Sequence, residues 1–250
     1  MITNKKKQLR VFNTIDALNE FAAQLLVDVA VKSVSERGRF VICLSGGNTP
    51  NGLYKLLSMT PYRDLIPWKN TFVFWSDERC VPADDERNNA YIASTVLLTK
   101  VNIPVTNIFP LPVDLPPVDA AKVYEASLKL FFGKEPPRFD LILLGLGGNG
   151  HTASLFPNTD VLHEKLRWVK EVYVEELRMY RVTMTPLLIN QASKIFFLVT
   201  GKEKSGILKN VFLCPQPDKY PVQLIDPDNK EEYWFLDERA ASLLNKEQLI

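Results

Sequence analysis

The chain has 250 residues, and its 30 lysines and arginines nearly balance its 29 aspartates and glutamates, giving a formal net charge of +1 at pH 7. This balance excludes recognition of nucleic acid or an anionic membrane through overall charge, so an anionic ligand needs a local cluster of cations. Hydrophobic residues make up 46% of the chain, as in soluble globular proteins. No apolar run approaches the roughly 20 residues of a membrane helix. We therefore expect a small-molecule ligand, with no nucleic acid and no membrane as partner.

The N-terminal residues and the cysteines indicate a cytoplasmic protein. Residues 1–10 carry the Lys5–Lys7 run with no apolar stretch behind it, so we predict a flexible basic tail and no secretory signal. The cysteines are odd in number and lack CxxC spacing, which predicts reduced thiols and neither a disulfide framework nor a zinc site. They are Cys43, Cys80 and Cys214. Cys43 lies within an apolar run and is expected in the core.

Predicted strands and helices alternate along the chain. Apolar residues at 3-4-3-4 spacing from Ile15 to Val29 predict a helix that ends at Gly38. Apolar runs predict strands at 39–44, 71–75, 107–110, 139–144, 168–174, 180–184 and 194–199. Further helices are predicted up to Leu57, at 89–98 and 119–132, after His151, after Gly201 and at 235–244.

This alternation predicts an α/β fold, with a mostly parallel sheet and helices on both faces, built as a single domain over residues 1–250. The strands are continuous apolar runs, as expected when both faces of a sheet are covered. Ligands of such folds bind beyond the carboxyl ends of the strands. Polar clusters that follow directly on a strand are therefore candidates for the functional site.

A glycine-rich segment follows the strand at 139–144. Its four glycines within residues 145–150 allow a sharp turn, and residues 152–154 are predicted to open a helix with His151 at the junction. Imidazole changes charge near neutral pH, and a helix N-terminus favours its neutral form. We interpret His151 as a general base; the alternative is a capping histidine bonded to backbone. His163 has no such setting and is expected on the surface.

A second turn joins the strand at 39–44 to a helix. Its glycines expose backbone N–H groups, its hydroxyls add donors, and the following helix points its positive end at the same place. We predict a phosphate-binding loop made by Ser45, Gly46, Gly47, Asn48 and Thr49. The alternative is a purely structural turn. This turn lacks the GxxxxGK[ST] pattern of a nucleotide site, and no GxGxxG follows the first predicted strand, so a nucleotide or dinucleotide cofactor is not expected.

Charged residues follow other strands. Asp77, Glu78 and Arg79 come directly after the strand at 71–75, where the alternative is a solvated surface loop. The planar guanidinium of Arg79 can hold a carboxylate or a phosphate. Arg181 and Lys204 are each ordinary surface charges if taken alone. Together with the glycine turn they can close around a dianionic phosphate.

These motifs, in this order, resemble the 6-phosphogluconolactonase family. The resemblance covers nearly the whole chain from about residue 10. It rests on SGGNTP at 45–50, SDERCVP at 76–82, GLGGNGHTASLFP at 145–157, RVTMTPLLINQA at 181–192, GKEKSGIL at 201–208 and the segment 234–237. It implies hydrolysis of 6-phospho-D-glucono-1,5-lactone to 6-phospho-D-gluconate in the pentose phosphate pathway, without metal or organic cofactor. It also implies a modified doubly wound, Rossmann-like sheet, shared with glucosamine-6-phosphate deaminases.

The resemblance implies a role for each candidate residue. His151 matches the general base that takes a proton from the attacking water. Arg79 matches an arginine that steadies the carbonyl oxygen as charge develops. Arg181 and Lys204 match cations that bind the phosphate above the 45–49 loop. Asp77 matches an aspartate that borders the sugar.

The chain departs from the family pattern at Asn149, where the family usually carries aspartate. An aspartate can orient the imidazole and stabilise its charged form, whereas asparagine can form the hydrogen bond but supplies no charge. We expect that geometry dominates and activity is retained. The alternative is a slow enzyme.

Two other functions stay open. A non-catalytic sugar-phosphate-binding protein would keep the pocket, and Asn149 is the feature that favours it. Glucosamine-6-phosphate deaminases carry a catalytic glutamate in an Asn-Glu-Pro context, where this chain has Leu155-Phe156-Pro157, and phenylalanine cannot relay a proton. A purely structural protein would leave the polar clusters unexplained. Oligomeric state is not fixed by the sequence; a monomer or small homo-oligomer is expected.

Overall fold

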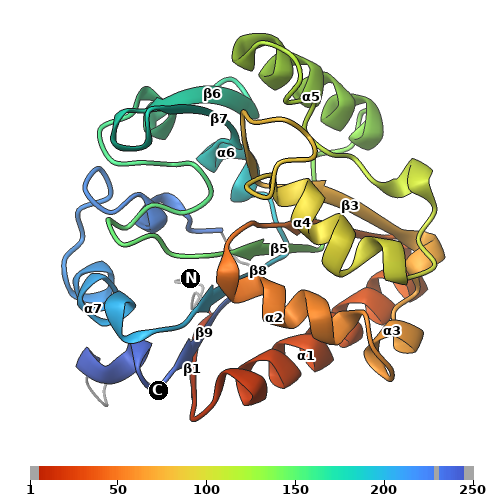
Figure 1. Cartoon of the computed structure of the whole chain (residues 1–250), viewed down its shortest axis with the longest axis horizontal. Coiled ribbons are helices and arrows are strands. Elements are labelled where there is room, and N and C mark those ends of the chain that lie inside the picture. Colours follow the sequence, from red (N-terminus) through yellow and green to blue (C-terminus); the bar gives the residue numbers. More distant parts are fainter. Residues whose placement is uncertain (1–5, 228–230, 245–250) are drawn as a thin grey trace, which may run out of the picture.

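Two sheets organise the chain in this computed structural model, which describes residues 6–227 and 231–244 apart from the side chains of Lys6 and Asn48. The larger sheet has the strand order β1-β9-β8-β5-β2-β3, and its strand pairs are parallel (Figure 1). Its strands are β1 (Lys6–Phe12), β2 (Phe40–Leu44), β3 (Thr71–Trp75), β5 (Leu141–Leu144), β8 (Lys194–Val199) and β9 (Glu231–Asp237).

The smaller sheet is antiparallel and has the order β4-β7-β6. Its strands are β4 (Asp77–Arg79), β6 (Val169–Val174) and β7 (Met179–Met184). The predicted strands at 168–174 and 180–184 are confirmed, but their antiparallel pairing in a separate sheet was not predicted. Residues 77–79, for which a surface loop was the alternative to a functional cluster, form the edge strand β4.

Seven α-helices lie within the described residues, and the first shows why the local prediction succeeded. They are α1 (Ile15–Arg37), α2 (Asn48–Leu57), α3 (Tyr62–Leu65), α4 (Asn89–Val96), α5 (Pro117–Phe132), α6 (Pro186–Ile189) and α7 (Ser205–Leu213). The Thr14 hydroxyl caps α1 by accepting from the Ala17 N–H at 3.0 Å. Gly38 ends it at φ +73°, which glycine adopts without steric cost. No helix in the described part of the chain is long and apolar enough to cross a membrane.

Helices cover both faces of the larger sheet, as predicted. Val73 shares an apolar pocket with Leu26 of α1. Its neighbours Phe72 and Phe74 contact the Phe131 ring of α5 instead, at centroid distances of 5.2 and 5.0 Å. Because successive strand residues point to opposite faces, α1 and α5 lie on opposite sides of β3. The fold is therefore a Rossmann-like α/β sheet.

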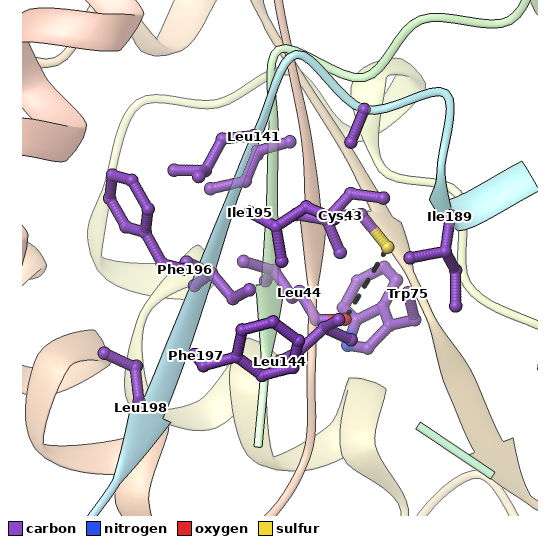
Figure 2. Packing of buried hydrophobic residues seen from close by; sticks show 14 of the residues in the cluster. Cys43, Leu44, Trp75, Leu141, Leu144, Ile189, Ile195, Phe196, Phe197 and Leu198 are labelled. Atoms are coloured by element: carbon purple, nitrogen blue, oxygen red, sulfur yellow. Dashed lines mark hydrogen bonds between the residues drawn. The ribbon is translucent and has the colours of Figure 1, made fainter. Parts of the chain in front are cut away.

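The central strands β2, β5 and β8 are buried on both faces (Figure 2). Cys43 of β2 is fully buried, as predicted, and its thiol lies 3.8 Å from the carbonyl oxygen of Leu44. Burial raises the pKa of this thiol well above its usual value, so it is a core side chain and not a nucleophile. Each large apolar side chain buried here contributes about 1.5–3 kcal/mol to folding.

The strand order creates a switch point between β2 and β5. From β2 the chain runs outward to β3 at one edge, whereas from β5 it runs in the other direction to β8 and β9. The loops that leave β2 and β5 therefore separate at their carboxyl ends and leave a crevice between them. Ligands of open α/β sheets bind in this crevice.

Near the N-terminus, the prediction of a flexible tail over residues 1–10 is wrong for residues 6–10. These residues belong to β1 and pair with β9 from Lys6↔Glu231 to Arg10↔Phe235. Lys7 also forms an ion pair with Glu232 at 3.2 Å. Residues 1–5 lie outside the described part. The tail was predicted from local composition, and the strand forms because its partner comes from the far end of the chain.

Two other predicted elements are wrong. The helix expected at 235–244 is strand β9 up to Asp237, followed by a short 3-10 helix at Ala240–Leu243. This segment lies between β1 and β8 and pairs with both, so it forms a strand inside the sheet and not a helix. The strand expected at 107–110 is a 3-10 turn at Val105–Asn107 with a single β-bridge from Ile108 to Val73.

Candidate active site

A cleft of about 570 Å³ lies at the carboxyl ends of β2, β5 and β8. It brings together segments that are far apart in sequence. Of the predicted site residues, it is lined by Ser45, Gly46, Gly47, Thr49, Asp77, Arg79, His151, Arg181 and Lys204. Asn149 does not line this cleft but contacts the ring of His151, and the side chain of Asn48 is outside the described part. The predicted shared pocket is therefore present.

The loop that carries His151 does not continue into a helix, so that prediction is wrong. Thr152 donates its hydroxyl to the carbonyl of Gly145 at 2.8 Å and forms an isolated bridge with Leu155. Ala153 has a left-handed φ of +48°, and Ser154 donates to Asp77 at 2.6 Å. The hydroxyls of Thr152 and Ser154 therefore do not cap a helix. They donate to Gly145, directly after β5, and to Asp77 at the start of β4.

His151 is held neutral by burial and not by a helix dipole. Removal from water lowers the pKa of its imidazole to about 4. The Asp77 charge opposes this shift and raises the pKa, whereas the charges of Arg181, Lys204 and Arg79 lower it further. The ring is therefore uncharged at pH 7, as predicted, although for another reason.

Asn149 determines which nitrogen of His151 carries the proton. Its Oδ1 accepts the backbone N–H of His151 at 3.2 Å and lies 2.6 Å from the ring Nδ1. A backbone N–H only donates, so the amide oxygen must face His151, and Nδ1 must donate to that same oxygen. Nε2 is then left with a free lone pair. Asparagine thus fixes the tautomer that a general base requires.

The ring of His151 is also fixed by packing. Phe156 stacks on it with a centroid distance of 4.0 Å and an interplanar angle of 23°. On Gly147, a Cβ atom would lie 2.1 Å from the ring, so only glycine leaves room for the imidazole. Sequence reasoning treated Phe156 only as the absence of a glutamate and missed its packing role. Its position five residues after the histidine was the available signal.

Two arginines face each other in the smaller sheet. Arg79 of β4 pairs directly with Arg181 of β7. Like charges opposite each other destabilise a strand pair, and here an acidic side chain compensates in part. Asp77 lies 3.8 Å from the Arg181 guanidinium. Burial lowers the pKa of Arg181, because removal from water disfavours the charged guanidinium. A bound anion would reduce the free-energy cost of keeping this cation buried.

The Asp77–Arg79 segment is not a solvated loop, because Asp77 is 5% and Glu78 is 1% exposed. The Glu78 carboxylate accepts three backbone N–H groups, from Arg79, Asn89 and Ala90. Burial raises its pKa to about 7, while these donors act to lower it. Glu78 therefore attaches β4 to the first turn of α4 and helps to fix Arg79 at the cleft.

The 45–49 loop presents an open helix terminus to the cleft. Gly47 precedes α2 at φ +100°, and no side chain caps the first turn of this helix. The free N–H groups and the helix dipole favour an anion at this point. Thr49 bonds to Thr200 at 3.2 Å, which links this loop to the segment after β8 that carries Lys204. The cleft can thus hold a phosphate beside a neutral imidazole.

Fold and site together define an α/β protein with a cleft at a sheet switch point, in which arginine and lysine side chains lie near a partly buried histidine. In the part of the chain that the structure describes, no three His, Cys, Asp or Glu side chains come together as metal ligands. The chain belongs to the glucosamine-6-phosphate isomerase/6-phosphogluconolactonase family, whose model matches residues 13–234.

Individual relatives agree with this assignment. The chain is 42% identical to a 6-phosphogluconolactonase of Synechocystis sp. over 219 residues, covering 85% of this chain and 88% of the relative. It is 37% identical to a 6-phosphogluconolactonase of Nostoc sp., covering 96% and 99%. The structure of a 6-phosphogluconolactonase from Trypanosoma cruzi matches with a TM-score of 0.85 at 29% identity, covering 98% of both chains. A monomeric glucosamine-6-phosphate deaminase shares the fold, with a TM-score of 0.81 at 20% identity.

Proposed function

We propose that this protein hydrolyses 6-phospho-D-glucono-1,5-lactone to 6-phospho-D-gluconate, a step of the oxidative pentose phosphate pathway. The observation that carries the proposal is the cleft that unites a neutral His151, free at Nε2, with Arg79, Arg181 and Lys204. The names of the relatives support the same activity. A cytoplasmic location is part of the proposal, in keeping with three cysteines that are free thiols.

In the proposed reaction, Nε2 of His151 takes a proton from water as the water oxygen attacks the lactone carbonyl carbon. The carbonyl oxygen gains negative charge, which Arg79 stabilises. The tetrahedral intermediate then collapses, and the bond from the former carbonyl carbon to the ring oxygen breaks. The ring oxygen takes the proton back from the imidazolium. The products are a carboxylic acid, which ionises, and a hydroxyl, and His151 is neutral again.

Asp77 supplies the negative charge that Asn149 lacks. Among the charged groups that act on His151, Asp77 has the largest effect, and it favours the imidazolium. The hydroxyl of Ser154 fixes its carboxylate. We therefore assign two separate roles: Asn149 orients the imidazole, and Asp77 stabilises the charge that the imidazole gains in the transition state.

Arg181, Lys204 and the 45–49 loop bind the phosphate in this proposal. A dianion reduces the repulsion between Arg79 and Arg181 and accepts hydrogen bonds from the open end of α2. The phosphate is remote from the reacting carbon, so these contacts position the substrate and do not enter the bond-making step. The deaminase alternative is disfavoured because Phe156, which covers the imidazole, has no proton to transfer.

A direct assay tests the proposal. Purified protein is mixed with freshly generated 6-phosphogluconolactone at pH 7, and its loss is measured against spontaneous hydrolysis. His151→Ala is expected to lower kcat by about 10²–10⁴-fold, because the general base is lost, while the dissociation constant of 6-phosphogluconate changes by less than about threefold. The matched control is His163→Ala, since the side chain of His163 is 69% exposed and lies outside the cleft.

Turnover of His151→Ala within about threefold of wild type would contradict the assigned base. Binding of 6-phosphogluconate without any acceleration of lactone loss would identify a non-catalytic binding protein. Release of ammonia from glucosamine 6-phosphate would identify a deaminase.

A further inference from the structure

Asn89 lines the cleft from the first turn of α4, and none of the roles given above uses its side chain. It is 2% exposed. Its Nδ2 donates to the backbone carbonyl of Asp77 at 2.9 Å, and its own N–H donates to Glu78. Because a carbonyl oxygen only accepts, the nitrogen of the amide must face Asp77. The amide oxygen therefore points away from β4.

That oxygen lies against Gly46 of the phosphate-binding loop. A Cβ atom built on Gly46 would lie 1.7 Å from Oδ1, 2.3 Å from Cγ and 2.7 Å from Nδ2 of Asn89. Gly46 is not among the residues with positive φ, so a left-handed backbone is not the reason for glycine here. Glycine is required here because the Asn89 amide fills the space of a side chain. Among the described residues, Oδ1 has no hydrogen-bond partner, so it contacts the loop by packing alone.

We propose that Asn89 is a positioning residue that sets the separation between the two halves of the cleft. One end of its amide is bonded to the strand that carries Asp77 and Arg79, and the other end supports the loop that receives the phosphate. The substrate is bound by both halves, so this separation determines whether its carbonyl reaches His151 when its phosphate is seated. A displacement of about 1 Å at such a site can cost up to about 10²-fold in rate.

A double-mutant cycle tests the contact. Gly46→Ala places a methyl group on the Asn89 amide, so we expect a fall in Tm and a KM for the lactone raised at least tenfold. Asn89→Ala removes the obstructing atoms. In that background the same Gly46→Ala substitution is expected to change Tm by less than about 1 °C and to raise KM by a factor at least about threefold smaller than in the wild-type background. If Asn89→Ala does not fold, Asn89→Ser replaces it, since it shortens the side chain and keeps a polar atom.

Two controls make the result specific. Gly206→Ala adds a methyl group where no atom lies within 4 Å and outside the cleft lining, so its effect should be the same in both backgrounds. The dissociation constant of 6-phosphogluconate, measured by calorimetry, reports positioning independently of turnover. The positioning role rests on the proposed function. The coupling of the two substitutions in Tm tests the contact between Asn89 and Gly46 whatever the substrate is.

Equal losses from Gly46→Ala with and without Asn89 would overturn the proposal. So would coupling in Tm without any coupling in KM or in 6-phosphogluconate affinity, because Asn89 would then be only a structural residue. A wild-type protein that neither binds 6-phosphogluconate nor hydrolyses the lactone would refute the proposed function and, with it, the positioning role. In that case the coupling in Tm would test only whether Asn89 contacts Gly46.

Discussion

The imidazole of His151 depends on neighbours that do different things. Asn149 selects the nitrogen that carries the proton, Phe156 covers one face of the ring, and Asp77 offers charge to the imidazolium. In the proposed mechanism, this separation of orientation from charge allows asparagine at position 149, where the family resemblance implies aspartate. Orientation needs only a hydrogen-bond acceptor, which both side chains supply.

This arrangement predicts an unusual pH dependence. A base acts in its neutral form, and the lowered pKa of about 4 keeps His151 neutral well into the acidic range. We expect kcat/KM, corrected for spontaneous hydrolysis, to stay flat from pH 7.5 to about 5 and to fall only below that. An unperturbed histidine with pKa about 6.5 would already lose about tenfold by pH 5.5, and that profile would contradict the burial argument.

Asn149→Asp tests the separation of roles. The new carboxylate favours the imidazolium and raises the pKa of His151, so the acidic limb of the pH profile should move to higher pH. At pH 7, kcat is expected to change less than tenfold, because orientation is unchanged. A gain of tenfold or more would mean that the missing charge limits the rate. Asn149→Ala is the matched control, since it removes the hydrogen bond as well.

Individual site residues differed in how far the sequence could predict them. Residues such as Arg79 and His151 were predicted because the carboxyl ends of parallel strands meet at one edge of a sheet. The contacts of Phe156 and Asn89 depend on side-chain packing between segments that are not adjacent in sequence. No local pattern encodes such contacts, so only the structure revealed them.

At the scale of elements, local signals predicted local structure. The helix α1 follows its 3-4 apolar spacing and ends before Gly38, and the strands β3 and β8 coincide with continuous apolar runs. Strand β9 was mistaken for the start of a helix because a short apolar run does not distinguish the two. The antiparallel pairing of β6 and β7 apart from the larger sheet depends on long-range contacts, which alternation along the chain cannot predict.

One helix offers a stabilising substitution. Gly206 is exposed in α7, and a methyl group added to its Cα would have no atom within 4 Å apart from its chain neighbours and the backbone of its own helix. Gly206→Ala should raise the free energy of unfolding by about 0.5–1 kcal/mol, because alanine loses less backbone entropy in a helix. Thermal unfolding should show a Tm higher by about 1–4 °C. Gly38→Ala is the opposite control: its φ of +73° makes alanine destabilising. No gain from Gly206→Ala would contradict this assignment.

At the scale of the molecule, the cleft forms where the two sheets and several loops converge, and its cations repel one another when no anion is bound. A ligand that binds the folded state at 100 times its dissociation constant stabilises it by about 2.7 kcal/mol. Saturating 6-phosphogluconate should therefore raise Tm by about 5–10 °C. Arg181→Ala should remove most of this increase by weakening the phosphate site. An equal increase in that variant would show that Arg181 does not bind the ligand.

The pairing of β1 with β9 also affects how the protein is made. These strands are the first and last of the described chain, and β9 is the only neighbour of β1 in the sheet. During synthesis, residues 6–12 leave the ribosome long before residues 231–237 are translated. The nascent chain must therefore hold β1 without its strand partner until residues 231–237 have emerged.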